Sequence, residues 1–241
     1  MPFAYYGAKH GLARRYPPPV SGVVVEPFAG SAAYSVYHAA ELDRVLLYDI
    51  DPQIVELWHE LQAMTPSDVD RIGEQVVRGE RFSHPLLAGM AGGWQVGETL
   101  AGRSCAVTPR MVISWPRVRR RILATLPHLG RWEIRHGSYT DAPDIEATWF
   151  VDPPYQPIVD YATSKGAAGG YRFGSVDYAA LAAWCRTRRG LVIVCEQSPS
   201  SWLPFAPLAK QANGAPNGTS RTEVIWRNDA EQMSLFGECV A

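Results

Sequence analysis

The sequence has few cysteines and no long apolar run. Its four cysteines, Cys105, Cys185, Cys195 and Cys239, are scattered, and no two of them form a C-x-x-C pair. This spacing argues against a zinc site or a disulfide framework and favours a reducing compartment. No apolar stretch approaches the length that spans a bilayer, and the first residues lack the plan of a signal peptide. We therefore predict a cytoplasmic protein with no membrane segment and no metal site.

Two common nucleotide-binding signatures are also absent. The stretch Glu26-Pro27-Phe28-Ala29-Gly30-Ser31 contains neither G-x-G-x-x-G nor a Walker lysine, so NAD and ATP are poor ligand candidates. The chain has 241 residues, of which 46% are hydrophobic and 20% charged, as in ordinary globular proteins. This length accommodates one large domain, or one domain with a substantial insertion.

What is present first is a strand, a glycine turn and a helix. The β-branched run at 22–25 predicts a strand, and we expect a helix that is capped near Ser31 and runs to about Leu42. A turn of this kind lets the backbone approach a nucleotide-like ligand closely.

A second strand, predicted at 44–48, ends in two acids. Asp51 precedes a helix expected from about Pro52 to Gln62 and is a candidate for its N-cap. Asp49 ends the strand, where an acid can accept hydrogen bonds from ribose hydroxyls. Taken alone, either acid could equally be a helix N-cap, so the interpretation as a nucleotide-like ligand site depends on the glycine turn and the acid together.

Residues 63–130 interrupt the alternation of strands and helices. We expect helices near 67–77 and 110–126, with a glycine-rich stretch between them. From Thr99 to Thr140 there are eight arginines and one acid, Glu133. Arg117, Arg120 and Arg121 lie near one face of the second helix, as in a contact with nucleic-acid phosphates. A solvated helix face is the alternative, although such faces usually mix acids with bases.

The central motif is Asp152-Pro153-Pro154-Tyr155, which follows an apolar strand predicted at 147–151. Two prolines cannot continue a strand, because neither has an N–H to donate. The motif therefore presents an acid and an aromatic ring at the carboxyl end of the strand, where open α/β sheets bind ligands. A simple capped turn is the alternative.

The rest of the chain predicts the remaining sheet. A long loop to about Gly174 is expected to cover the site, and a helix at 177–189 and strands at 191–195 and 222–226 follow. The stretch 198–218, rich in Pro, Asn and Gly, predicts a loop.

Together these motifs resemble the α group of DNA adenine-N6 methyltransferases, over most of the chain apart from 63–130. Tyr6-Gly7-Ala8-Lys9, the segment from Glu26 to Ser31, and Asp49 match the family's cofactor motifs in their order along the chain. Ser138-Tyr139 stand where the family usually has Asp-Phe beside the adenine ring of the cofactor. Asp152-Pro153-Pro154-Tyr155 matches the catalytic tetrapeptide outright.

The resemblance implies a Rossmann-like α/β fold with a mostly parallel sheet and an inserted target-recognition subdomain. Residues 1–62 and 131–228 would form the catalytic methyltransferase domain. Residues 63–130 would form the inserted target-recognition and DNA-binding subdomain, and residues 229–241 a flexible tail. The expected reaction is direct methyl transfer from S-adenosylmethionine to a flipped-out adenine in double-stranded DNA. The enzyme would be associated with the nucleoid, and its origin (host, phage or restriction–modification system) is left open.

The resemblance assigns a role to each matched residue. The catalytic set is Asp152, Pro153, Pro154 and Tyr155. The cofactor set is Tyr6, Gly7, Lys9, Glu26, Pro27, Phe28, Gly30, Ser31, Asp49, Ile50, Ser138, Tyr139 and Asp152. The DNA-binding set, from the basic stripe and the long loop, is Arg110, Arg117, Arg120, Arg121 and Tyr171.

Two departures limit what the resemblance implies. Ser138 replaces the usual acid, and the middle segment lacks the recognition hairpin of GATC enzymes, so no target sequence is carried over. Cytosine-N4 methylation is the nearest alternative, although that chemistry more often has Ser in place of Asp152. A catalytically silent, cofactor-binding DNA-docking protein is the alternative of another class.

The last residues carry a separate signal. Gln232-Met233-Ser234-Leu235-Phe236 resembles the peptide by which bacterial proteins bind the replication sliding clamp. Gln232, Leu235 and Phe236 would make the contacts, with the two apolar side chains in a pocket of the clamp. The alternative is a tail that folds Leu235 and Phe236 back onto its own domain.

Overall fold

The computed structural model describes residues 2, 3, 5, 9, 11–82, 105–156, 175–211 and 221–229. Its centre is a seven-stranded sheet in the order β5-β2-β1-β6-β7-β9-β8. The strands are β1 (Val23–Glu26), β2 (Arg44–Asp49), β5 (Trp132–His136), β6 (Ala147–Val151), β7 (Gly190–Gln197), β8 (Ala206–Gln211) and β9 (Arg221–Arg227).

The sheet is parallel from β5 to β7, and β9 runs antiparallel to both of its neighbours. The chain leaves β1 toward β2 and β5, then returns to place β6 on the other side of β1. The strand order therefore reverses between β1 and β6, which is the switch point where open α/β sheets bind ligands. The predicted α/β class with a mostly parallel, Rossmann-like sheet is confirmed.

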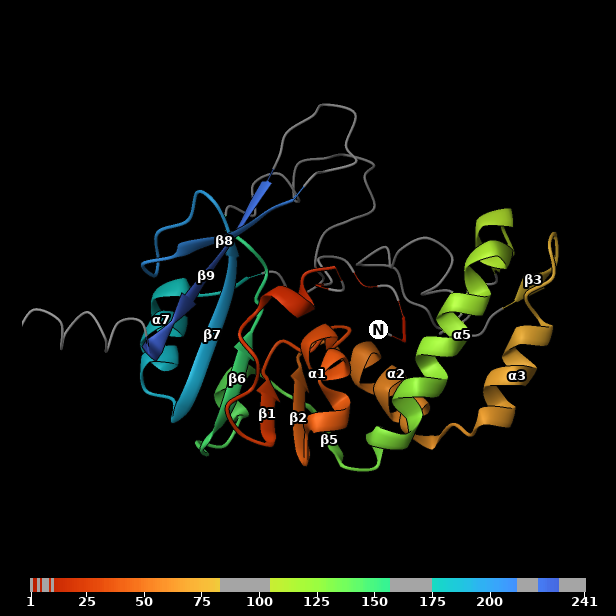
Figure 1. The fold of residues 1–241 in the computed structure, drawn as a ribbon, viewed down its shortest axis with the longest axis horizontal. Helices are drawn as coiled ribbons and strands as arrows, with labels where there is room; N and C mark the ends of the chain where they lie inside the picture. Colours follow the sequence, from red (N-terminus) through yellow and green to blue (C-terminus); the bar gives the residue numbers. More distant parts are fainter. Residues whose placement is uncertain are drawn as a thin grey trace, which may run out of the picture.

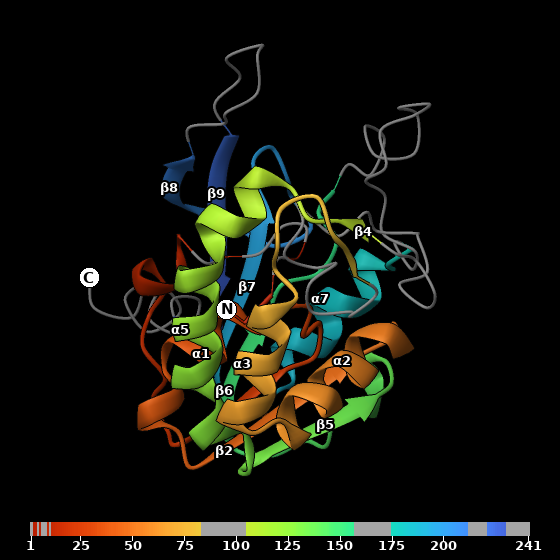
Figure 2. The same ribbon diagram turned by 90° about the vertical axis from the view of Figure 1, so that its right-hand side faces the viewer.

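Helices cover both faces of the sheet (Figures 1 and 2). Figure 2 shows α1 (Ala33–Tyr37) and α5 (Pro109–Leu129) on one side and α7 (Tyr178–Arg186) on the other. α2 (Pro52–Ala63) and α3 (Pro66–Glu74) complete the first layer, together with the short helices η1 (Ala13–Arg15) and η2 (Ala39–Glu41). A further short helix, η3 (Tyr139–Asp141), follows β5, and β3 (Arg81–Phe82) and β4 (Cys105–Ala106) form a separate two-stranded ribbon.

Two apolar cores follow from this layering. Alternate strand residues such as Val24 and Phe150 pack with Tyr34, Trp58 and Ile122 beneath α1, α2 and α5. Their sequence neighbours point to the opposite face and pack beneath α7. Because β1 and β6 are buried on both faces, their sequences are continuous apolar runs.

Two predicted elements differ in the structure. The helix expected from Ser31 to Leu42 begins only at Ala33, because Ala32 adopts a left-handed conformation with φ of 42° and serves as an N-cap without a side-chain bond. It ends at Tyr37, and the separate short helix at Ala39–Glu41 follows it. The predicted loop at 198–218 contains β8, whose Pro207 is tolerated because β8 is the edge strand of the sheet. The other predicted helices and strands lie within a few residues of the observed ones.

α5 contacts α2 and η2 as well as α3, and its buried Ile122 and Leu129 belong to the same core as the strand residues Val24 and Phe150. The division of the chain into a catalytic domain and an insertion at 63–130 stays a prediction.

Candidate active site

The turn after β1 is held by contacts from three parts of the chain. Gly30 has φ of +45°, and a Cβ there would lie 2.7 Å from the ring of Tyr5, so only glycine fits. Its N–H donates to Oδ2 of Asp49 at 2.8 Å, and its carbonyl accepts from Nε1 of Trp58 at 2.8 Å. The turn is therefore fixed at both its donor and its acceptor.

Asp49 and Asp51 make different hydrogen bonds and have different roles. Asp51 accepts from the Gln53 N–H at 3.0 Å and caps α2, as predicted. Asp49 accepts from Gly30 and, through Oδ1, from the Asp51 N–H at 2.9 Å. Burial raises the pKa of Asp49 to about 6 despite these donors. A carboxylate has about four lone-pair sites, so Asp49 keeps acceptor capacity toward the cavity that it lines.

A cavity of about 800 Å³, including its open mouth, lies over the carboxyl ends of β1, β2, β5 and β6. Eight of the predicted cofactor residues line it: Pro27, Phe28, Gly30, Asp49, Ile50, Ser138, Tyr139 and Asp152. The rings of Phe28 and Tyr139 stack at 5.7 Å within this wall. The cavity thus combines aromatic faces with carboxylates, the kind of lining that small-molecule sites have.

The other predicted cofactor residues lie beside it or outside the described residues. Glu26, Ser31 and Lys9 line a smaller cavity of about 280 Å³, which shares Phe28, Gly30 and Asp152 with the first. Glu26 is buried and accepts from the Ser35 N–H at 2.8 Å. Burial raises the pKa of Glu26 to about 8. Tyr6 and Gly7 lie outside the described residues.

Asp152 is paired with a buried lysine. Lys9 Nζ lies 3.2 Å from Asp152 Oδ1 and 3.5 Å from Oε1 of Glu223, a residue of β9. Burial opposes the ammonium charge, but Asp152 and Glu223 together raise the pKa of Lys9. Burial likewise raises the pKa of Asp152 to about 6, while Lys9 acts in the opposite direction.

Glu223 organises this buried cluster, and the sequence analysis missed it. Its Oε1 accepts from the Tyr155 hydroxyl at 2.6 Å and from the Tyr16 hydroxyl at 2.7 Å. Lys9 Nζ also lies 4.1 Å from the centre of the Tyr155 ring and so covers one face of it. A single acid next to the apolar run of β9 was the available signal, because a charge buried in a strand needs partners.

Further contacts fix the tetrapeptide. The hydroxyl of Tyr178, the first residue of α7, donates to the Pro154 carbonyl at 2.7 Å. The Gln156 N–H lies 3.2 Å from Oε1 of the buried Glu196 in β7. Because both contacts come from rigid elements, Asp152 and Tyr155 are held in one geometry at the end of β6.

The predicted DNA-binding residues are only partly described. Arg117 and Arg120 are exposed on α5 and Arg121 is half-buried, whereas the side chain of Arg110, and Tyr171 altogether, lie outside the described residues. The clamp residues Gln232, Leu235 and Phe236 lie outside them too.

One arginine of this helix has an acidic partner on a neighbouring helix. Arg119 pairs with Asp70 of α3 at 2.6 Å, so an acid distant in the sequence neutralises one of the charges of α5, although not one of the predicted face of Arg117, Arg120 and Arg121. Counting acids along a single helix could not detect a partner on a neighbouring helix.

Comparison with known proteins gives no match to any family model and none to a curated protein. Solved structures do match at low similarity. The rRNA methyltransferase AviRa from Streptomyces viridochromogenes is 17% identical, with 86% of this chain and 76% of that chain covered and a TM-score of 0.41. A proposed methylase from Haemophilus influenzae is 9% identical, with 85% of each chain covered and a TM-score of 0.36.

Some other kinds of site are not found in the part of the chain that the structure describes. Within those residues, no group of three or more His, Cys, Asp or Glu side chains is arranged to hold a metal ion. Among the described helices, none is both long enough and apolar enough to cross a membrane.

The arrangement defines what the site can do chemically. A cavity suited to a nucleoside-like molecule ends at a carboxylate, Asp152, whose position is fixed by Lys9. This carboxylate can accept a hydrogen bond from a reacting group, and the nearby Tyr155 offers an aromatic ring. The geometry is suited to orienting a planar amine against a ligand in the cavity.

Proposed function

We propose that this protein transfers a methyl group from S-adenosylmethionine to the N6 atom of adenine in DNA. One observation carries the proposal: Asp152 of the catalytic tetrapeptide lines the same cavity as Phe28, Gly30 and Asp49 of the cofactor motifs. Residues more than 100 positions apart in the sequence thus meet at the switch point of the sheet.

The cavity fits S-adenosylmethionine by its chemistry. Asp49, beneath the Gly30 turn, is placed to accept hydrogen bonds from ribose hydroxyls, and Phe28 and Tyr139 to contact the adenine ring. The side of the turn near Glu26 and Ser31 would take the methionine part. When bound, S-adenosylmethionine supplies an electrophilic methyl group on its sulfonium.

The chain's own residues would orient the acceptor. The exocyclic amine of adenine is a poor nucleophile, because its lone pair is delocalised into the ring. Asp152 accepts one amine hydrogen and the carbonyl of Pro153 the other, which stabilises the positive charge that develops on the nitrogen. Tyr155 stacks on the base through the ring face that Lys9 leaves uncovered. Since a base inside a duplex cannot reach this pocket, the base must flip out.

Changing Asp152→Ala tests the proposal. We expect single-molecule sequencing of DNA from cells that express the wild-type chain to report N6-methyladenine in a defined context. The variant should lose activity by roughly 100-fold or more, because a transition-state acceptor is removed. Asp144→Ala, which removes an exposed acid paired with Arg188, is the matched control and should methylate normally.

The same experiment separates the alternatives. N4-methylcytosine in place of N6-methyladenine would identify a cytosine enzyme. Wild-type protein that binds cofactor and duplex DNA but leaves both bases unmodified would be a docking protein. Retained adenine methylation in the Asp152→Ala variant would contradict the mechanism.

A further inference from the structure

Several arginines of η1 and α5 have no acidic partner among the described residues. Arg44, Arg119 and Arg135 are each paired with a described acid at 2.6–2.8 Å. Five other arginines have no acid within ion-pair distance among the described residues. They are Arg14 and Arg15 of η1 and Arg117, Arg120 and Arg121 of α5. All five are exposed except the half-buried Arg121.

Arg14 and Arg121 face each other across an open groove. The groove lies between η1, α1 and η2 on one side and α5 on the other, with a volume of about 1,180 Å³ including its mouth. His128 and the exposed ring of Tyr37 lie along it, and the remaining described residues that line it are small, apolar or hydroxyl-bearing. No acid is among these described lining residues, so the lining itself offers Arg14 and Arg121 no counter-charge.

The arginines of α5 also act on one another. Burial lowers the pKa of Arg121, and the nearby positive charges of Arg117 and Arg120 lower it further. Like charges held together without an acid favour the binding of an anion with several charges, because each contact relieves the repulsion.

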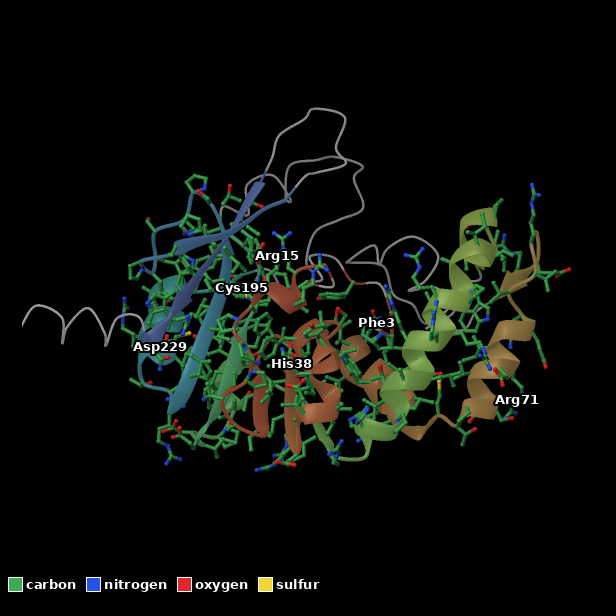
Figure 3. All side chains as sticks on the ribbon, in the orientation of Figure 1. Phe3, Arg15, His38, Arg71, Cys195 and Asp229 are labelled. Atoms are coloured by element: carbon green, nitrogen blue, oxygen red, sulfur yellow. The ribbon has the colours of Figure 1, made fainter. Side chains whose placement is uncertain are left out.

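The short helix η1, which forms one wall of the groove, is connected to the candidate active site at both of its ends. The Lys9 carbonyl accepts from the N–H groups of Leu12 at 2.8 Å and Ala13 at 2.7 Å, which anchors the start of η1 next to the lysine that holds Asp152. Tyr16, directly after η1, donates to Glu223 in the same buried cluster. In the view of Figure 3, Arg15, the last residue of η1, is drawn above strands β1 and β2 of the sheet. A ligand held by η1 is therefore positioned relative to Asp152.

We propose that this groove binds the phosphodiester backbone of duplex DNA, with Arg14 and Arg121 contacting phosphates from its two walls. The proposal rests on the proposed function and adds Arg14 and the groove to the predicted contacts. A guanidinium can donate two parallel hydrogen bonds to a phosphate, which suits a repeating anion better than an isolated one. Backbone contacts of this kind fix the register of the protein on DNA, while the sequence is recognised elsewhere.

The test measures how salt weakens DNA binding. The full-length chain is titrated with a fluorescent duplex at several salt concentrations, as wild type and as Arg14→Gln/Arg121→Gln. Since each phosphate contact contributes about 0.9 to the slope of log K against log salt, we expect the slope to fall by about two. Binding of S-adenosylmethionine, measured by calorimetry, should stay within twofold of wild type.

The control is Arg44→Gln/Arg135→Gln, which removes the same net charge from β2 and β5, where both arginines pair with Glu133. Its slope should equal that of wild type. Equal slopes for wild type and Arg14→Gln/Arg121→Gln, or equal losses in both double variants, would overturn the groove assignment. Tighter binding of an RNA hairpin or an acidic protein than of duplex DNA would also overturn it.

The two proposals fail in different ways. If wild type methylates adenine while the groove variant keeps the full salt slope, only the groove assignment is wrong. If the groove variant shows the expected fall in salt slope but the wild-type protein methylates no base, the proposed reaction is wrong and the groove assignment is correct.

Discussion

Lys9 and Glu223 act on Asp152 with opposite electrostatic sign. Lys9 lies 3.2 Å from Asp152 and lowers its pKa, whereas Glu223 raises it, next to the larger effect of burial. Because stabilisation of the positive charge that develops on the amine requires the carboxylate form, activity should be lost as the pH falls through about 6, the pKa of Asp152. The same cluster therefore sets both the position and the charge of the acceptor.

We expect Lys9→Met and Glu223→Gln to move the acid limb of the pH–rate profile in opposite directions. Without the ammonium, the pKa of Asp152 rises, and the limb moves to higher pH with roughly a tenfold loss of rate near pH 6. Without the second carboxylate it moves to lower pH, while glutamine still accepts from Tyr16 and Tyr155.

Single-turnover methyl transfer at saturating cofactor measures these limbs, because saturation removes any effect of the Asp49 pKa on cofactor binding. Shifts in the same direction for both variants would contradict the electrostatic account. At this scale the sequence predicted Asp152 and Tyr155 but not Glu223 or Tyr16. Tyr16 and Glu223 are separated by 207 positions, and no local pattern joins them.

At the scale of elements, the contact between α3 and α5 depends on a glycine. A Cβ at Gly73 would lie 2.7 Å from Nε1 of Trp115, closer than packed atoms approach. The two helices are also joined by the exposed pair Arg119–Asp70, which contributes little stability by itself. Close packing at Gly73 therefore decides how near α3 can lie to the basic helix.

We expect Gly73→Val to lower the free energy of unfolding by about 1–3 kcal/mol, because overpacking forces the helices apart. Gly130→Ala is the control: it follows α5 with φ of −61° and has no atom within 4 Å of the added Cβ. Urea denaturation of both variants measures the difference. Equal stabilities would show that α3 shifts without cost.

At the scale of the whole molecule, the predicted clamp contact concerns residues beyond the described structure. We expect purified sliding clamp to retain the full-length protein and to lose a chain that ends at Asn228. Leu235→Ala/Phe236→Ala should behave like the shortened chain, because the apolar anchors contribute most of the binding energy of such peptides. Equal retention of all three proteins would contradict the prediction.

The sequence alone determined the features that depend on neighbouring residues. Two prolines end β6 because neither has an N–H, the buried strands are apolar runs, and Asp51 precedes Pro52 at a helix start. These local rules predicted the strands and placed Asp49 and Asp152 at strand ends, while the mostly parallel sheet was predicted from the family resemblance. They did not predict β8, since a strand containing Pro207 is stable only at the edge of a sheet.

Only the tertiary structure decided which charges meet. Lys9, Tyr16, Asp152 and Glu223 come from three separate parts of the chain and share one buried site, because burial of each charge requires polar partners. Likewise, the fold gives Arg119 an acid from α3, whereas Arg14 and Arg121 have no acid partner among the residues that the structure describes. Charge pairing depends on distance in space, and the order of residues along the chain does not contain that distance.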